Sequence, residues 1–216
     1  MNEHGSEPVR GLPGQLPEGE RLLWQGSPTA WGIARRALHV PTLALYFAVL
    51  LAWGAVATLR QGAPASDALS GAALPAALAF GTLGLLAGVS WLMARTTVYT
   101  VTSRRVVARF GIAVPVTVNF PFALVDAVGL RAYPDATGDI PLSLSTPSHL
   151  PWPVLWPHVR PWRLAQPNPM LRAVPDAARV ASLLGRALAA AASQPASMAP
   201  ASADSAIAPA RGPVAA

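Results

Sequence analysis

The side chains that could carry acid–base or metal chemistry in this chain are few and scattered. The 4 histidines lack carboxylate partners at the spacing that a metal site needs; they are His4, His39, His149 and His158. The aspartates Asp126, Asp135 and Asp139 fall in strand or turn patterns, where solvated aspartates are much commoner than general bases. No P-loop, GxSxG elbow, HExxH helix or dinucleotide fingerprint is present. We therefore expect no enzymatic activity, no metal site and no bound cofactor.

His39 has a second interpretation, because it stands at the start of a long apolar segment. An imidazole there is a good axial ligand for a chlorin or haem. A solitary histidine at a membrane interface is more commonly solvated, so both readings stay open.

A tract rich in Trp, Pro and Arg, residues 149–169, is the strongest candidate for a recognition surface. Prolines exclude a regular strand ladder, while Trp and Arg dominate interface hot spots. The predicted partner-docking residues are Trp152, Trp156, His158, Arg160, Trp162 and Arg163. Two other readings remain open: the tryptophans lie on lipid headgroups, or they cover one end of a barrel.

Two uncharged apolar segments precede this tract in the chain and predict how the protein is held at a membrane. Residues 38–59 and 69–93 are each about 20 residues or longer, enough to cross a hydrocarbon core. A short polar loop joins them, so residues 38–94 predict a transmembrane helical hairpin. Positive residues stay on the cytoplasmic side, and arginines flank the hairpin at Arg35, Arg36, Arg95, Arg104, Arg105 and Arg109. Since the loop has only Arg60, both termini should be cytoplasmic.

Small residues recur along single faces of both segments, at intervals of three or four. The predicted helix-packing residues are Ala44, Ala48, Ala52, Ala77, Gly81, Gly84 and Gly88. Such faces let helix backbones approach closely where no hydrophobic force drives association. They either join the two helices of the hairpin or receive another membrane protein.

Composition agrees with a partly embedded protein. Of 216 residues, 52% are hydrophobic and only 12% are charged, about half the usual charged fraction. The net charge is +6, every basic residue is Arg, and the absence of cysteine excludes disulfides and thiolate metal sites. With two spans present, an anionic membrane explains this charge better than nucleic acid. Residues 1–16 and 193–216 should be disordered, and no cleavable signal peptide is expected. Residues 17–37 should form an interfacial segment; a short strand and a surface turn before the first span are an equal alternative that is compatible with anchoring.

After Arg95 the pattern becomes β-like. Strands are expected at 96–102, 105–110, 114–120, 124–132, 140–144 and 169–174. A helix over 177–192 should follow and pack on the sheet with Val180, Leu183, Leu184, Ala187 and Leu188. The fold class is therefore an α+β membrane protein. A two-helix transmembrane hairpin precedes a small antiparallel β-sandwich or barrel, over 95–192, capped by a C-terminal helix.

Two stretches of the sequence resemble known protein families, which narrows the choice of function. Tyr99–Gly111 (YTVTSRRVVARFG), after a two-span hairpin, resembles the start of bacterial pleckstrin-homology-like domains. Residues 16–28, the hairpin, and above all residues 150–188 with PMLRAVPDA resemble the PuhB-type photosynthetic complex assembly proteins of purple bacteria. This resemblance implies a non-enzymatic factor that helps assemble the reaction centre and core antenna, with the reaction-centre H subunit or nascent core as partner. It supplies no catalytic residues, and it does not imply that the chain itself holds bacteriochlorophyll.

These readings together place the protein in the inner (intracytoplasmic) membrane as a multi-pass protein in contact with lipid. A homo-oligomer is left open, and no nucleic-acid partner is expected. The alternative function is a generic membrane-anchored pleckstrin-homology-like protein that binds lipid or scaffolds another membrane complex.

Overall fold

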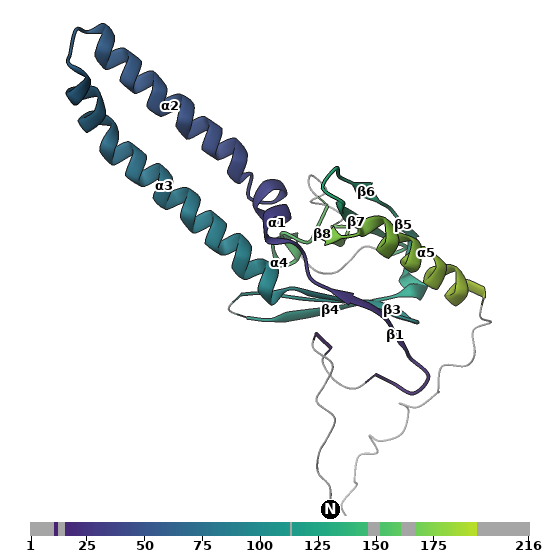
Figure 1. Cartoon of the computed structure of the whole chain (residues 1–216). Coiled ribbons are helices and arrows are strands. Elements are labelled where there is room, and N and C mark those ends of the chain that lie inside the picture. Colours follow the sequence, from purple (N-terminus) through teal and green to yellow (C-terminus); the bar gives the residue numbers. More distant parts are fainter. Residues whose placement is uncertain (1–10, 13–15, 113, 147–151, 161–166, 194–216) are drawn as a thin grey trace, which may run out of the picture.

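The computed structural model describes residues 11–12, 16–112, 114–146, 152–160 and 167–193. It consists of a long helical hairpin that projects from one end of a domain built of two sheets and a helix (Figure 1). The stretches expected to be disordered, 1–16 and 193–216, lie almost entirely outside the described residues.

The two apolar segments form the hairpin helices α2 (Val40–Arg60) and α3 (Ala65–Thr96), within a few residues of the predicted bounds. Both are long and apolar enough to cross a membrane, and few of their side chains are covered by the rest of the chain. A core helix of a soluble protein would bury an apolar stripe. The exposure of these two helices instead suits helices surrounded by lipid.

The foot of α3, its last turns next to the domain, belongs to the domain rather than to the hairpin alone. α3 has 32 residues against 21 in α2, so at 1.5 Å per residue it is about 48 Å long and outruns its partner. There it packs on α1 (Ala30–Arg36), where Ile33 and Ala94 share a small buried cluster.

The segment expected to be interfacial, residues 17–37, is instead part of the folded domain. It forms the strand β1 (Leu22–Gly26) as well as α1. The α1 helix begins where Thr29 Oγ1 accepts a hydrogen bond from Gly32 N at 3.2 Å, which satisfies an orphan amide of the first turn. Because β1 pairs with a strand that comes after the hairpin, the domain is not confined to residues 95–192.

The first sheet is antiparallel with the order β1-β2-β3-β4. Its strands after the hairpin lie where the sequence predicted them: β2 (Val98–Thr102), β3 (Arg105–Phe110) and β4 (Val116–Pro121). Val118 and Phe120 of β4 are buried while Thr117 and Asn119 are exposed, because an edge strand turns only alternate residues to the core.

The second sheet is centred on β7 (Thr137–Leu144), which pairs with β8 (Met170–Pro175) on one edge. β5 (Val125–Val128) and β6 (Arg131–Ala132) follow one another along the other edge. The short helices η1 (Phe122–Leu124) and α4 (Trp152–Leu155) lie in the connections.

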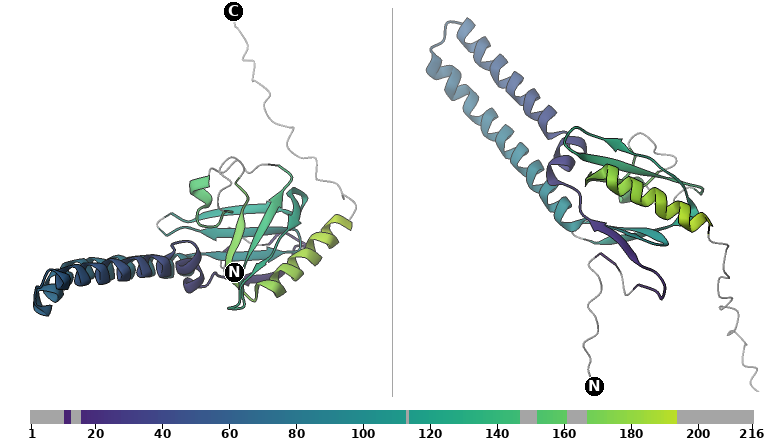
Figure 2. Two further views of the ribbon diagram at one scale, coloured as in Figure 1. Left: turned by 90° about the horizontal axis from the view of Figure 1, so that it is seen from above. Right: turned by 45° about the vertical axis from the view of Figure 1, so that its right-hand side comes forward.

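The predicted C-terminal helix is confirmed as α5 (Ala177–Ser193), which packs on β5, β7 and η1 (Figure 2). Its buried residues, Ala177, Val180, Leu184 and Ala187, recur every three or four positions and join the core between the sheets. A pleckstrin-homology-like fold fits this arrangement of two antiparallel sheets and a closing helix.

Replacing Leu184 by Ala should test how far stability depends on this core. Leu184 is fully buried, so the change removes buried methyl groups and leaves a cavity, at a cost of about 2–5 kcal/mol. Chemical unfolding of the detergent-solubilised protein measures it. Leu124→Ala deletes the same atoms at an exposed position and should cost less than about 1 kcal/mol; equal losses would contradict the assigned core.

Candidate functional site

The Trp/Pro tract is divided between surface and interior. Trp156 and Arg160 are exposed, as a docking surface requires, whereas Trp152 is half-buried and packs against the core. His158 is only 3% exposed. The predicted docking residues Trp162 and Arg163 lie outside the described residues.

Buried anchors on both sides hold the two exposed residues in place. Leu155 at the end of α4 is buried in the main core. Val159 forms an antiparallel bridge with Pro169, and Arg160 N donates to Asn168 O at 2.9 Å. A loop tied down at these points presents its exposed side chains without a large ordering cost.

The prediction that His158 docks a partner is wrong, because the ring is buried against residues of β2 and β3. Its Nδ1 lies 2.6 Å from Tyr99 Oη and its Nε2 lies 3.3 Å from Thr97 Oγ1, and its ring packs on Phe110. Burial, together with the nearby Arg172 guanidinium, lowers the pKa of His158 to about 3. The imidazole is therefore neutral at physiological pH.

One tautomer of His158 is compatible with a single directed chain of hydrogen bonds from Arg172 N to Thr97. Arg172 N donates to Tyr99 Oη at 3.1 Å, so the Tyr99 hydroxyl has its own proton to donate to His158 Nδ1. Nε2 then carries the ring proton and donates to Thr97 Oγ1. Burial raises the pKa of Tyr99 well above its usual value, which keeps that hydroxyl a donor. This chain links β8 to the end of α3 through neutral groups.

A cavity of about 320 Å³ opens beside His158, at the end of the domain next to the hairpin. Its walls come from three places: the foot of α3 (Met93, Thr96), the β3–β4 connection (Ile112, Val114) and the tract (Trp156, His158). The walls are mainly apolar, and the volume is within the range of small-molecule sites.

The hairpin is joined to the domain where α1 meets β8. Two residues of β8 oppose one of β7 there, a β-bulge that gives Ala173 a left-handed backbone, φ 52°. Ala173 N donates to Asp139 Oδ1 at 2.8 Å, and Ala173 O accepts from Thr29 N at 2.9 Å. A side chain on Gly32 would collide with Ala173 Cβ, so only glycine lets α1 lie this close.

Arg36 makes the second attachment. Its Nη2 donates to both carboxylate oxygens of Asp135, at 3.0 and 2.9 Å, and its guanidinium lies 3.6 Å from the centre of the Tyr133 ring. A hydrogen bond from Thr137 and the charge of Arg36 hold the pKa of Asp135 below its usual value. Arg36 precedes the first hairpin helix, as predicted for a residue flanking a span, and it is also engaged with the domain.

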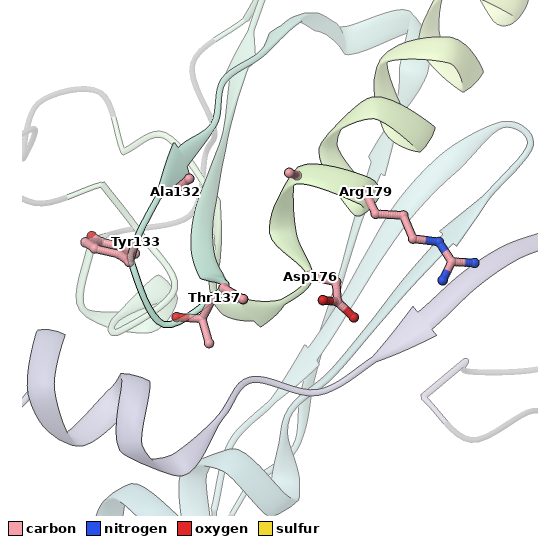
Figure 3. Close-up of a pocket in the computed structure, with 7 residues that line it drawn as sticks. Ala132, Tyr133, Thr137, Asp176 and Arg179 are labelled. Carbon is pink, nitrogen blue, oxygen red and sulfur yellow. The ribbon is translucent and has the colours of Figure 1, made fainter.

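A second cavity, about 450 Å³, lies between the β6–β7 turn and the start of α5 (Figure 3). The polar groups on its wall are partly engaged: Tyr133 Oη donates to Asp139 at 3.0 Å and Thr137 Oγ1 to Asp135 at 2.7 Å. Figure 3 shows Arg179 extending away from Tyr133 rather than converging with it. We assign this cavity no ligand.

The small residues of α3 do not join the hairpin together. Ala77, Gly81, Gly84 and Gly88 are exposed, and no atom lies within 4 Å of a side chain built on any of the three glycines. The face of α3 that is buried carries Ala68, Ala79 and Ser90 instead. On α2, Ala44 is half-buried, while Ala48 and Ala52 are exposed. The predicted close packing within the hairpin is therefore wrong for most of these residues.

His39 is exposed at the start of α2. In the part of the chain that the structure describes, no group of three His, Cys, Asp or Glu side chains could hold a metal ion.

Comparison with known proteins identifies relatives of the chain. The family model for the bacterial PH domain matches residues 36–188. An uncharacterised 23.7 kDa protein in the puhA 5′ region of Rhodobacter capsulatus is 33% identical over 190 residues, covering 87% of this chain and 89% of the relative. No solved structure matches the chain.

The low pKa of His158 predicts a specific pH dependence of stability. The unfolded imidazole binds its proton near pH 6.5, whereas the folded one does so only near pH 3. Stability is thus unaffected above pH 6.5 and falls below it by up to about 1.4 kcal/mol per pH unit. Unfolding measured at pH 7 and pH 5.5 should show this loss in the wild type and not in His158→Gln. His39→Gln, at an exposed histidine, should behave like the wild type; parallel profiles for all three proteins would contradict the prediction.

A pair of leucine substitutions tests the outward orientation of the α3 glycines. Ala79→Leu adds volume at a buried position of α3 and should destabilise the solubilised protein by about 1–3 kcal/mol. Gly84→Leu adds more volume in open space and should change stability by less than about 0.5 kcal/mol. Thermal unfolding in the same detergent measures both. A loss at Gly84 as large as that at Ala79 would show that the glycine face is packed.

Proposed function

The chain belongs to the bacterial PH domain family, and on that premise we propose that it is a non-enzymatic assembly factor. In this proposal it is anchored in the inner (intracytoplasmic) membrane of a purple bacterium and assists assembly of the photosynthetic reaction centre and its core antenna. The observation that carries the proposal is a firmly attached domain that displays Trp156 beside the foot of an apolar hairpin, with Arg160 exposed on the same tract.

Anchoring follows from the exposure of the hairpin. Its apolar side chains are uncovered along both helices, and this surface is stable only in hydrocarbon or against another protein. Arginines are concentrated on the domain side of the hairpin, with Arg60 alone in the connecting loop. The positive-inside rule then places the domain and both termini in the cytoplasm.

Docking is assigned to the exposed part of the Trp/Pro tract. Trp156 and Arg160 are side chains of the two types that most often carry binding energy at interfaces. Because the hairpin confines the domain to the membrane plane, a partner in the same membrane meets it at a high effective concentration. Weak contacts are then sufficient for a transient assembly step.

The partner class is suggested by the relative. That protein is in the puhA 5′ region of Rhodobacter capsulatus, a position compatible with a role in photosynthesis. We propose the reaction-centre H subunit or the nascent core as the partner. The exposed small-residue face of α3, with Gly81, Gly84 and Gly88, offers a second contact for a membrane helix of that complex or of another copy of this chain.

Substituting the two exposed docking residues tests the proposal. The double variant Trp156→Ala, Arg160→Glu should bind the partner roughly tenfold more weakly or worse, since each such residue commonly contributes more than 1 kcal/mol. Reaction-centre absorbance per unit of membrane protein should fall, while immunoblots show an unchanged amount of this protein in carbonate-washed membranes.

Arg104→Glu is the matched control for the charge change. Arg104 is exposed at the β2–β3 turn, at the other end of β3 from the cavity, and its substitution should leave reaction-centre levels unchanged. Normal reaction-centre levels in the double variant would count against the docking role. Normal levels in a strain lacking the whole gene would favour the alternative, a pleckstrin-homology-like protein that binds lipid or scaffolds another membrane complex.

A further inference from the structure

Two exposed Trp–Arg pairs lie where the hairpin joins the domain. Trp31 and Arg35 are one helical turn apart on α1, and Trp91 and Arg95 have the same spacing near the end of α3. Trp31 is 57% exposed and Trp91 is 52% exposed, and both arginines are exposed. The Arg95 guanidinium lies 4.9 Å from the centre of the Trp91 ring. Because positions four apart share one side of a helix, each Trp has a cation beside it on an uncovered surface.

The two helices that carry these pairs are packed together at one level. Ile33 of α1 and Ala94 of α3 share a buried cluster, and Met93 packs against it. Figure 1 shows α1 beside the foot of α3, between the long part of the hairpin and the sheets. We call this packed pair, α1 and the foot of α3, the junction. The Trp–Arg pairs are on its outside.

The spacing of the exposed tryptophans along the hairpin matches a bilayer. Trp53 is 74% exposed on α2 and lies about 10 Å from the loop end of the hairpin, at 1.5 Å per residue. Trp91 lies about 39 Å from the same end, so the two levels are about 28 Å apart. The hydrocarbon core is about 30 Å thick, and Trp side chains concentrate at its two boundaries. Arg95 is one turn, about 6 Å, farther from the core, which is the level of the lipid headgroups.

The charged side chains of the junction are all positive. No Asp or Glu occurs between Glu20 and Asp67, or between Asp67 and Asp126, the two stretches that contain α1 and the foot of α3. Arg35 and Arg95 are exposed there. Cationic side chains at a membrane surface attract anionic lipid headgroups. Charge and depth therefore both suit the anionic surface of a bilayer.

We propose that the junction binds the headgroups of anionic phospholipids in the leaflet next to the domain. Trp31 and Trp91 lie at the boundary between acyl chains and headgroups, and Arg35 and Arg95 bind lipid phosphates. The proposal rests on the anchoring of the hairpin in a bilayer, and it names the class of lipid that the anchor prefers. Because Thr29, at the start of α1, is bonded to Ala173 of β8, headgroups held by α1 also fix the height and orientation of the domain above the membrane.

Selectivity between lipids is the direct test. The full chain is placed in phosphatidylcholine vesicles with a trace of spin-labelled phosphatidylglycerol or spin-labelled phosphatidylcholine, and the motionally restricted fraction of each label gives its relative affinity. We expect the wild type to favour phosphatidylglycerol several-fold at low salt. In about 1 M NaCl the ratio should fall toward one, because salt screens exposed charges. The double variant Arg35→Gln, Arg95→Gln should lose most of the preference at low salt.

The matched control is Arg104→Gln, Arg186→Gln, which removes the same charge from two exposed positions of the domain. It should keep the preference of the wild type. Equal affinity of the wild type for the two lipids, or the same ratio in both double variants, would overturn the headgroup site. A preference that persists in high salt would overturn the role given to the arginines.

The absence of cysteine allows the depth of the junction to be measured separately. Leu92→Cys, 37% exposed beside Trp91, and Leu45→Cys, 66% exposed in α2, each carry a fluorophore, and the vesicles contain lipid with a doxyl quencher near the headgroup or deep in the acyl chain. We expect the shallow quencher to act more strongly at 92 and the deep quencher more strongly at 45. Leu124→Cys, 44% exposed in the domain, should be quenched by neither.

The two proposals fail in different ways in this measurement. No quenching at 45 overturns the anchoring, and with it both the proposed function and the headgroup site. Quenching at 45 but not at 92 means that water or protein surrounds the junction, which overturns the headgroup site and leaves the anchored assembly factor intact.

Discussion

The attachment of α1 to the bulge in β8 is the contact on which the rest of the arrangement depends. Ala173 adopts a left-handed backbone that costs a non-glycine residue about 1–2 kcal/mol. The bonds that Ala173 makes to Asp139 and Thr29 offset that cost, and Gly32 leaves room for the close approach. The hairpin follows α1 directly, so this contact determines where the hairpin leaves the domain. The other contacts of α1 are the Ile33–Ala94 packing on α3 and the pair between Arg36 and Asp135, whose carboxylate is exposed, and exposed pairs contribute little.

The buried polar side chains of this domain are connected by hydrogen bonds, and few of them are charged. His158 and Tyr99 are both neutral, and each accepts or donates along one chain from Arg172 N to Thr97. The charged Asp139 accepts hydrogen bonds from Tyr133 Oη and Ala173 N, and its charge favours the buried Arg172 guanidinium. Apart from Arg172 Nε, which is buried without a hydrogen-bond partner among the described residues, these groups are satisfied, and satisfied networks favour one arrangement of the elements over alternatives. This network holds β8, the Trp/Pro tract and the end of α3 in fixed positions around the cavity.

The exposed surfaces all lie where the proposed function needs them. The glycine face of α3 is not packed on α2, Arg160 is exposed, and the apolar cavity opens between Trp156, the foot of α3 and the β3–β4 connection. Protein contact is assigned to the helix face and the tract. A chain without catalytic groups can thus act by holding other membrane components at fixed positions.

The hairpin, most strands and α5 could be read from the sequence because each depends on local pattern: charge-free length, alternation, and a three-to-four periodicity. The exposure of Trp156 and Arg160 fits one of the readings that the sequence left open for the tract, and the half-burial of Trp152 fits another. Other features are set by residues far apart in the chain. β1 was not predicted as part of the domain because its partner β2 lies beyond the hairpin. His158 was misplaced because only the folded chain surrounds it with Tyr99, Thr97 and Phe110, residues about 50 to 60 positions away.

The glycines of α3 form a face that the sequence reveals by its periodicity. Periodicity does not tell which neighbour that face contacts. In the folded hairpin the buried face of α3 carries residues such as Ala79, so the glycine face is exposed.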